Sequence, residues 1–322
     1  MKSIVIYYSL TGNTKRIAEA IHSGMSQLAE KCDIAPLGEV DTRELLNYEL
    51  IGLGSPVMSY QEPPIITSFI NDLPSLKGRY GFTFCTHGVR PASYIARMVA
   101  ALRRKGLTVT GWNDWYGSAF IPFAPKPYYT DGHPDEIDLK EAKDFGREIV
   151  ERSRRISTGE ARLIPKLPRK EKYDRLYGKP PPPVSEEMGE LLAIIGKLKP
   201  RLNVEKCKYP KCSICIDNCP THSINLSESP PISYQTCGPC LLWLCEQLCP
   251  AGAIEVDWEI MDNLEDSIKS YFDQLAEPMK EFKELRRFRS LLTVEEGQDK
   301  PLYKIKKHPR LIIRDGVVEL PR

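Results

Sequence analysis

Eight of the ten cysteines in this chain of 322 residues lie between Cys207 and Cys249. They form two runs of four, and each run ends in Cys-Pro. The first run is Cys207, Cys212, Cys215 and Cys219, with four, two and three residues in its gaps; the second run is Cys237, Cys240, Cys245 and Cys249, with two, four and three. The N-terminus lacks the long apolar segment and cleavage site of a secretory signal peptide, so we expect a cytoplasmic protein with reduced thiols. Metal binding is therefore a better expectation than disulfides.

Zinc and iron–sulfur centres both use cysteines in this way. Zinc sites usually separate two C-x2-C pairs by a longer loop and do not require the Cys-Pro ending. The standard iron–sulfur run is C-x2-C-x2-C-x3-C-P. Each run here is that pattern with two added residues, in the first gap of the first run and in the second gap of the second run. Both runs keep the C-x3-C-P ending, which favours two iron–sulfur clusters over zinc.

On these cysteines and Cys-Pro pairs, residues 204–257 resemble the two-cluster bacterial ferredoxins. In that family the fourth cysteine of each run binds the cluster of the other run. The resemblance implies one [4Fe-4S] cluster on Cys207, Cys212, Cys215 and Cys249, and a second on Cys237, Cys240, Cys245 and Cys219. The added residues leave the potentials and the loop paths open. Trp243 and Leu244 lie in the expanded gap of the second run, where we expect them to shield the second cluster rather than to dock a partner.

The first 155 residues alternate strand-like and helix-like segments. The strand-like segments are 3–8, 48–55, 81–87 and 107–115, and the helix-like segments are 15–31, 63–73, 91–106 and 138–155. Strands that alternate with crossover helices predict a parallel sheet covered on both faces. The remaining cysteines, Cys32 and Cys85, fall in apolar strand-like segments, where we expect them to be small buried side chains.

The sequence Ser-Leu-Thr-Gly-Asn-Thr at 9–14 lies between a predicted strand and a predicted helix. A helix N-terminus attracts anions through its exposed amides and its dipole. Hydroxyls at Ser9, Thr11 and Thr14 add donors, Gly12 permits a tight turn, and Asn13 adds an amide. The loop has no lysine, so it is not a nucleoside-triphosphate loop, and residues 52–57 lack the third glycine of a dinucleotide fingerprint. We expect the loop to bind a phosphate group.

At this loop, and over residues 1–155, the chain resembles the flavodoxins, whose S/T-x-T-G-x-T sequence wraps the phosphate of FMN. The resemblance implies a doubly wound, parallel five-stranded sheet with FMN at the carboxyl ends of its strands. It implies phosphate contacts from Ser9, Leu10, Thr11, Gly12, Asn13 and Thr14, and ring contacts from Ser55, Pro56, Val57, Tyr60, Thr86, His87 and Gly88. Tyr60 is the first candidate for stacking on the flavin, with Trp115 and Tyr116 as others. His87 is either a group at the flavin edge or a structural loop histidine.

Four regions follow from these assignments. They are a flavodoxin-like FMN-binding domain at 1–158, a basic, proline-rich linker with a short helix at 159–200, a small α+β ferredoxin-like domain at 201–258, and a helical C-terminal extension at 259–322. The tetraproline at 180–183 predicts a semi-rigid spacer. Proline at 278 predicts a break in the long helix of the extension, and Arg-Asp-Gly-Val at 314–317 predicts a short hairpin. The sequence does not decide whether the extension packs on the other domains or mediates a homodimer.

The combination resembles flavodoxin–ferredoxin fusion proteins. This resemblance implies an oxygen-sensitive, anaerobic electron carrier that relays low-potential electrons between unidentified redox partner proteins through FMN and two [4Fe-4S] clusters. The alternative is a flavin-dependent reductase acting directly on a small substrate. The carrier is favoured because the flavin loops show no lysine, aspartate or paired carboxylates placed for acid–base chemistry, apart from His87 and Arg90.

Charge and hydropathy narrow the partners. The chain has 45 basic and 43 acidic residues, which gives no argument for nucleic acid. No apolar stretch approaches the roughly 20 residues that a membrane-spanning helix needs. The basic residues of the linker could dock an acidic partner in an assembly or regulatory role, but a solvated surface is the simpler expectation.

Overall fold

The computed structural model divides the chain into two compact units. The first unit contains residues 1–118 and 132–180, and the second contains residues 119–131 and 181–322. The structure describes residues 1–119, 121–122, 124, 128–179, 186–237, 242–261, 264–284, 288–289, 291, 312–314 and 317–319. Cys240 and the tetraproline at 180–183, both part of the sequence predictions, lie outside the described residues.

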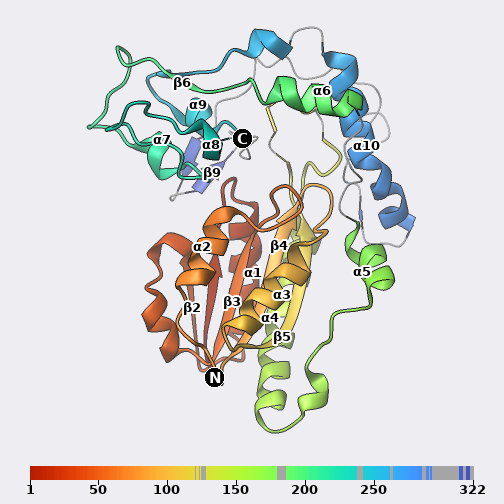
Figure 1. The fold of residues 1–322 in the computed structure, drawn as a ribbon. Helices are drawn as coiled ribbons and strands as arrows, with labels where there is room; N and C mark the ends of the chain where they lie inside the picture. Colours follow the sequence, from red (N-terminus) through yellow and green to blue (C-terminus); the bar gives the residue numbers. More distant parts are fainter. Residues whose placement is uncertain are drawn as a thin grey trace. The chain divides into compact units, whose positions relative to one another are not determined.

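The first unit is built on a five-stranded sheet with strand order β2-β1-β3-β4-β5 (Figure 1). Its strands are β1 (Lys2–Tyr7), β2 (Lys31–Pro36), β3 (Leu50–Pro56), β4 (Tyr80–His87) and β5 (Thr108–Tyr116). All neighbouring strands are parallel, so their carboxyl ends share one edge of the sheet. This confirms the expected doubly wound, five-stranded parallel sheet. The alternation of segments does not include β2, a half-exposed edge strand. Cys32 does lie in this strand, as its strand-like surroundings predict, but it is half-buried rather than buried.

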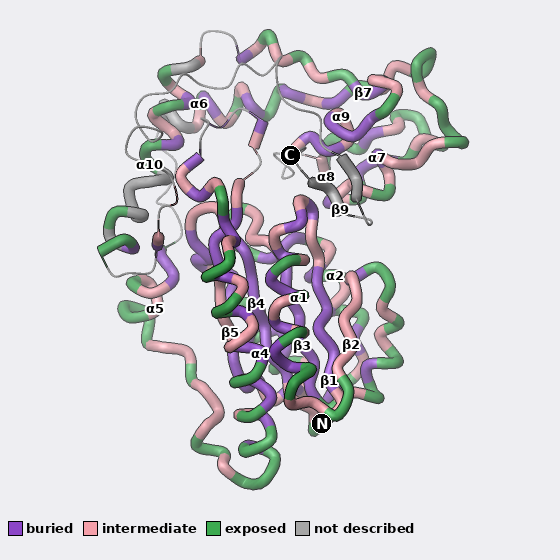
Figure 2. Tube along the Cα trace, turned by 180° about the vertical axis from the view of Figure 1, so that it is seen from behind, coloured by how far each residue is buried: buried purple, intermediate pink, exposed green. Residues whose placement is uncertain are grey.

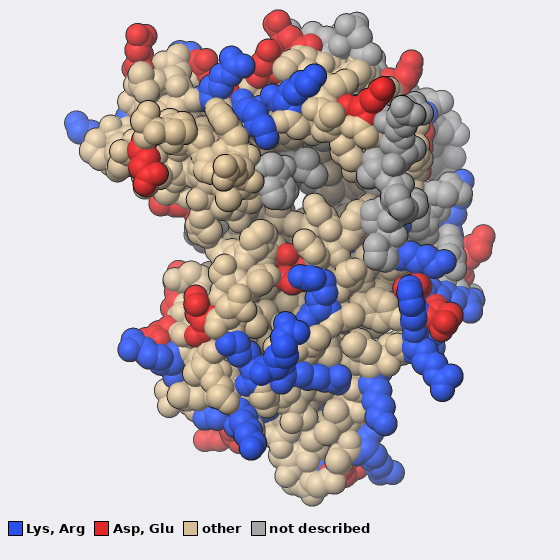
Figure 3. All heavy atoms as spheres, viewed as in Figure 1, with Lys and Arg blue, Asp and Glu red and all other residues tan. Residues whose placement is uncertain are grey.

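Helices cover both faces of the sheet, and β1, β3 and β4 between them are mostly buried (Figure 2). They are α1 (Asn13–Met25) and α4 (Glu136–Ser157) on one face, and α2 (Pro64–Asp72) and α3 (Tyr94–Arg104) on the other. Two short 3-10 helices, η1 (Leu37–Glu39) and η2 (Thr42–Asn47), connect β2 to β3. The apolar side of α3 enters the core, whereas lysine and arginine side chains gather over its outer side (Figure 3). Each helix is therefore amphipathic in the way that a covered sheet requires.

Two glycines allow α1 and α4 to touch backbone to backbone. A Cβ on Gly24 would overlap the carbonyl oxygen of Lys143, and a Cβ on Gly146 would overlap the carbonyl oxygen of Ile21. Backbone atoms cannot rotate away as a flexible side chain can, so any side chain at these positions would push the helices apart. The two glycines thus fix the position of α1, the helix that follows the predicted phosphate loop.

Two segments belong to a different unit from the one that the expected domain boundaries would give them. Residues 159–180, expected to begin the linker, belong to the first unit, where η3 (Ala161–Leu163) precedes α5 (Lys170–Tyr177). The Tyr173 hydroxyl of α5 donates to the carbonyl of Ala92 at 2.7 Å. Residues 119–131 belong to the second unit, where Tyr128 is buried in an apolar cluster. Each segment contributes a buried aromatic side chain to its unit, Tyr177 in the first and Tyr128 in the second.

The second unit combines short strands and one-turn helices with two longer helices. Its elements are α6 (Glu186–Ile195), β6 (Arg201–Leu202), α7 (Ile214–Asp217), α8 (Tyr234–Cys237), α9 (Leu244–Leu248), β7 (Ile254–Glu255), η4 (Trp258–Met261), α10 (Glu265–Glu284), β8 (Ile312–Arg314) and β9 (Val317–Glu319). β6 pairs antiparallel with β7, and β8 pairs antiparallel with β9 around the predicted hairpin turn. One apolar cluster surrounds the cysteines, and another joins α6, η4 and α10.

The expected break of the last long helix at Pro278 was wrong, because α10 continues through this residue. Proline removes one helical hydrogen bond at a cost of about 3 kcal/mol. Ile268 and Phe272 before it and Phe282 after it are buried, so packing holds α10 on both sides. None of the helices within the described ranges is long and apolar enough to cross a membrane.

Replacing Gly146 by alanine tests the close approach of α1 and α4. The added methyl group meets a backbone carbonyl, so we expect Gly146→Ala to lower the free energy of unfolding by about 1–3 kcal/mol. Urea unfolding measures this change. Gly38→Ala is the control, since a Cβ at this exposed position of the same unit meets nothing within 4 Å. A Gly146→Ala protein as stable as wild type would contradict the proposed contact.

Candidate cofactor sites

The loop between β1 and α1 presents an uncapped helix N-terminus at the carboxyl edge of the sheet. Gly12 has a left-handed φ of 85°, and among the described residues no side chain caps α1. The first turn of α1 contains no acidic residue. Leu10 is buried and Thr11 is half-buried beside it. The first amides of α1 and the positive end of its dipole are therefore available to an anion.

Hydroxyl groups around this loop have unused hydrogen-bonding capacity. Ser9 Oγ is buried and has no hydrogen-bond partner among the described residues. The hydroxyl oxygens of Thr14 and Thr86 lie 2.7 Å apart, so one of their two hydrogens remains for another acceptor. Asn13 Nδ2 donates to the Ser118 carbonyl at 3.0 Å and so fixes the loop. An unsatisfied buried donor costs about 1–3 kcal/mol, which a phosphate oxygen would remove. These residues fit a phosphate group.

The loop after β3 is a tight turn that presents Tyr60. Backbone hydrogen bonds of 2.9 and 3.0 Å close residues 58–61, and Ser59 and Tyr60 have φ of 47° and 67°. Such turns normally use Asn or Gly, so this conformation is strained. A bidentate ion pair between Glu62 and Arg97, with both N···O distances 2.7 Å, holds the loop where it joins α2. The strained turn is thus fixed at its base.

Two buried basic side chains lie in or next to the loop that follows β4. His87 is 4% exposed; its Nε2 lies 3.0 Å from Asp114 Oδ2, and its Nδ1 has no partner among the described residues. Arg90 is 7% exposed, and its guanidinium lies 5.2 Å from the centroid of the Tyr60 ring. Gly178, at φ 78°, leaves room for Arg90, since a Cβ there would overlap Arg90 Cδ. No carboxylate within the described residues pairs with Arg90, so this buried charge favours an electron-rich ligand.

The predicted stacking aromatics differ in exposure. Trp115 is 3% exposed and packs edge-on against Phe145, with ring centroids 5.8 Å apart, in the core beneath α4. Tyr116 is also buried and packs edge-on against His87 at 4.6 Å. Tyr60 is half-buried, and its burial raises its pKa while the charge of Arg90 opposes that rise. Tyr60 is the one of the three candidates whose ring is partly accessible.

The remaining predicted ring contacts lie on two loops that are joined directly. The Val57 amide donates to the Thr86 carbonyl at 2.8 Å, which ties the loop after β3 to the end of β4. The Ser55 side chain is fully buried, with its Oγ 3.0 Å from the Tyr94 hydroxyl. Pro56, Val57 and Gly88 are half-buried. Ser55 therefore supports the loop through its side chain and offers a ligand only its backbone. Sequence reasoning missed Asp114 and Tyr94, which act through other residues.

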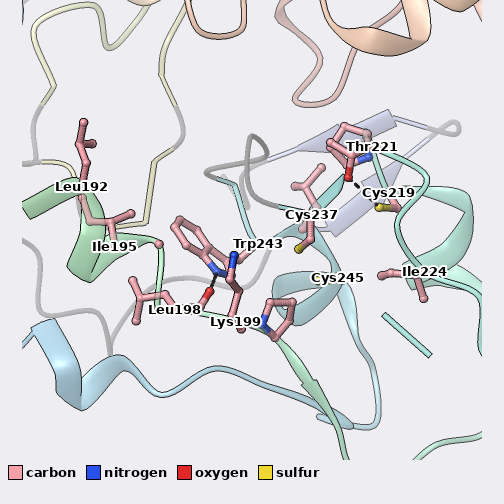
Figure 4. Close-up of a pocket in the computed structure, with 14 residues that line it drawn as sticks. Leu192, Ile195, Leu198, Lys199, Cys219, Thr221, Ile224, Cys237, Trp243 and Cys245 are labelled. Atoms are coloured by element: carbon pink, nitrogen blue, oxygen red, sulfur yellow. Dashed lines mark hydrogen bonds between the residues drawn. The ribbon is translucent and has the colours of Figure 1, made fainter. Parts of the chain in front are cut away.

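Two cavities of the second unit each gather cysteines from both runs. The first cavity is lined by Cys207, Cys212 and Cys215 of the first run and by Cys249 of the second run. The second cavity is lined by Cys237 and Cys245 of the second run and by Cys219 of the first run (Figure 4). The sequence-based assignment of Cys240 to the second set falls outside the described residues. Each cavity thus combines one run with the last cysteine of the other.

The chain repeats one backbone turn after the last cysteine of each run. Three residues after Cys219 and Cys249, His222 and Gly252 have left-handed φ values of 49° and 58°. Their amides donate to the cysteine carbonyls at 3.2 and 3.1 Å. The next amide in each turn donates to the cysteine Sγ, at 3.3 and 3.1 Å. The two Cys-Pro turns are therefore structural equivalents.

Strand pairing follows the same interleaved arrangement. Leu202, five residues before the first run, pairs antiparallel with Ile254, five residues after the second run. Ile232, five residues before the second run, pairs antiparallel with Ile224, five residues after the first run. The beginning of each half thus contacts the end of the other, as the cysteines do. An interleaved internal repeat accounts for both.

The sulfur atoms of the first cavity affect one another electrostatically. Burial raises the pKa of Cys215 to about 11, and the nearby Cys249 and Cys207 contribute to the rise. The Tyr209 amide lies 3.5 Å from Cys207 Sγ, to which it donates. Crowded thiolates repel one another unless a cation is bound between them. The donor set fits a metal centre with four thiolate ligands.

The expanded gap of the second run places Trp243 against the second cavity. Trp243 is 8% exposed, and its Nε1 donates to the Leu198 carbonyl at 2.8 Å (Figure 4). Its ring packs edge-on against Trp258, with centroids 5.1 Å apart. Leu244 is 1% exposed and lines the same cavity. Both residues line the second cavity, and Trp243 also belongs to the apolar cluster of α6 and η4.

Comparisons with known proteins find similarity to the first unit. The family model of the flavodoxin domain matches residues 4–108. An uncharacterized protein of Methanocaldococcus jannaschii is 27% identical over 164 residues, which are 47% of this chain and 99% of that protein.

Solved structures include an archaeal flavodoxin, with 25% identity, TM-score 0.40 and coverage of 48% of this chain and 99% of that one. Oxidised flavodoxin 1 from Bacillus cereus has 18% identity, TM-score 0.36 and coverage of 47% and 98%. With the observed strand order and the loop after β1, the family match identifies residues 4–108 as a flavodoxin domain, which gives this chain a flavodoxin-type electron-transfer domain.

Proposed function

We propose that this chain is an electron carrier that binds FMN in its first unit and two [4Fe-4S] clusters in its second, and that it relays low-potential electrons between redox partner proteins. The observation that carries the proposal is the interleaving of the two cysteine runs, in which each cavity takes its last cysteine from the other run. The flavodoxin domain at residues 4–108 supports the FMN part of the proposal.

The loop after β1 supports FMN as the ligand of the first unit. The uncapped N-terminus of α1 and the unsatisfied Ser9 hydroxyl would bind its phosphate. Tyr60, His87 and Arg90 lie on or beside loops at the same edge of the sheet, where the ring of a flavin would lie. FMN supplies exchange of one or two electrons when bound. These residues bind and orient it.

The cysteine geometry supports clusters over zinc. Structural zinc sites commonly use two C-x2-C pairs separated by a longer loop and do not require the Cys-Pro ending that both runs keep. Interleaved runs with Cys-Pro endings are the arrangement of two-cluster ferredoxins. Backbone amides that donate to Cys219 and Cys249 would stabilise the sulfur charge of a cluster ligand. Clusters supply one-electron exchange when bound, and their presence with FMN in one chain raises the effective concentration of one for the other.

A flavin-dependent reductase acting on a small substrate is the second candidate. The observation that favours it is the pairing of His87 with Asp114, which leaves the other imidazole nitrogen without a partner among the described residues. An oriented imidazole of this kind could transfer a proton. The carrier remains preferred because the phosphate loop and the two sets of cysteines suffice for electron transfer, which needs no acid–base group.

Cofactor content tests the proposal directly. Protein purified without oxygen should contain about eight irons and one FMN per chain and should bleach in air. Metal analysis, sulfide determination and flavin fluorescence after denaturation measure this content. Zinc in place of iron would contradict the cluster proposal, and iron without flavin would contradict the FMN proposal, so the two halves are tested separately.

Removal of the Ser9 hydroxyl should weaken binding through the phosphate alone. A hydrogen bond to a charged group contributes about 1.5–3 kcal/mol, so we expect Ser9→Ala to lower FMN affinity roughly 10- to 100-fold. Riboflavin, which lacks the phosphate, should bind equally to both proteins in fluorescence titrations. Ser23→Ala, an exposed change on α1, is the control. Equal losses for FMN and riboflavin would indicate a general disturbance and contradict this role.

Paired substitutions test the interleaving of the cysteine runs. If Cys207 and Cys249 hold the same cluster, the double variant Cys207→Ser/Cys249→Ser should keep about half of the iron. Cys207→Ser/Cys219→Ser should lose both clusters, because each substitution affects a different one. Iron and sulfide content after anaerobic reconstitution measures both outcomes. Cys32→Ser, in β2 of the first unit, should keep all of the iron, and the reverse result for the two double variants would indicate sequential ligation.

A further inference from the structure

The two equivalent Cys-Pro turns differ in side chains. After Cys219 the sequence is Pro-Thr-His-Ser, and after Cys249 it is Pro-Ala-Gly-Ala. Thr221 and Ser223 therefore bring hydroxyl groups to positions where the other turn has only methyl groups. The two turns share their backbone hydrogen bonds, so they differ from each other only in side chains. The first cavity also has the Tyr209 amide 3.5 Å from Cys207 Sγ, a longer contact than either turn amide makes.

The hydroxyl groups form a chain that ends on sulfur. Thr221 Oγ1 lies 3.6 Å from Cys219 Sγ (Figure 4). Ser223 Oγ lies 2.6 Å from Thr221 Oγ1, and Thr236 Oγ1 lies 2.8 Å from Ser223 Oγ. Ser223 is 3% exposed, so water has little access to the middle of the chain.

Metal coordination would set the direction of this chain. A metal-bound thiolate has no hydrogen to donate, so Thr221 must donate its hydroxyl to Cys219. The Thr221 oxygen then accepts from Ser223, whose oxygen accepts from Thr236. Each hydroxyl donates once, and the successive donors polarise one another.

We propose that Thr221 makes the cluster held by Cys219 the more easily reduced of the two. The inference rests on the proposed function and identifies residues that tune it. A hydrogen bond to a ligand sulfur stabilises the additional negative charge of the reduced form and so raises the reduction potential. Ser223 and Thr236 are positioning residues, because they act through Thr221.

Charges near the two cavities favour the same order. Lys199 is half-buried and lines the second cavity, whereas Lys208, which lines the first, is exposed. Solvent screens an exposed charge more strongly than a partly buried one. Apolar side chains line both cavities, so desolvation affects both. One electron added by dithionite would therefore reside mainly on the Cys219 side, with no change of bond or proton.

Thr221→Val tests the proposal because it removes the hydroxyl and keeps the shape. Anaerobic potentiometric titrations, followed by electron paramagnetic resonance, should show the higher of the two cluster potentials falling. We expect a roughly 3- to 10-fold loss in the one-electron reduction equilibrium, or about 30–60 mV at 59 mV per tenfold. Thr221→Ser should retain the wild-type potential, and Ser223→Ala should give a smaller shift in the same direction. The lower potential should not move in any of them.

Three results would overturn the inference. They are unchanged potentials in Thr221→Val, equal shifts of both potentials, and a Thr221→Ser shift as large as that of Thr221→Val. Iron content distinguishes these outcomes from failure of the proposed function, since a wild-type chain that binds no iron has no cluster to tune. Should Thr221→Val not bind eight irons, the shift in Ser223→Ala decides: a fall of the higher potential supports the inference, and no change contradicts it.

Discussion

Sulfur provides the proposed metal ligands and also part of the core in the cysteine-rich part of the second unit. The buried cluster there consists of Cys215, Ile224, Ile232, Cys249, Ala253 and Ile254, so two of its six members are cysteines. A region below about 70–80 residues seldom gains more than 3–5 kcal/mol from one apolar core. Bonds from metal to thiolate would then be part of the folding free energy. Interleaved strands would follow from the proposed clusters, because ligands from both halves would have to meet at each metal centre.

In the first unit the corresponding constraint is the direction of the strands. Five parallel strands place the loops after β1, β3 and β4 at one edge, and the bond from Val57 to Thr86 holds two of these loops together. The glycines of α1 and α4 fix the helix that carries the free amides. Phosphate-binding capacity therefore comes from the architecture, whereas any contacts with a ring would depend on the individual side chains of Tyr60, His87 and Arg90.

Sequence predicted those features whose cause is local. The loop at 9–14 and the alternation of strands and helices depend on neighbouring residues, and the cysteine runs can be read directly from their spacing. The helix α5 was not predicted, because contacts distant in sequence stabilise it, such as that of Tyr173 with Ala92. Trp115 was a candidate for stacking on the flavin, but its place against Phe145 buries it in the core. Asp114 gives no signal of its own, since its role depends on the register that brings it to His87.

The added residues of the two cysteine runs have different structural effects. Those of the first run lie in a loop where Tyr209 is 40% exposed and contacts Ser227 through its hydroxyl. Those of the second run bring Trp243 into the apolar cluster of α6 and η4. Thr221 and Lys199 also lie at the second cavity. The two cysteine runs share the same backbone turn and the same strand pairing. They differ in the length of their gaps and in the side chains around them. The second cavity carries most of these differences, so the duplicated frame has two unequal cavities.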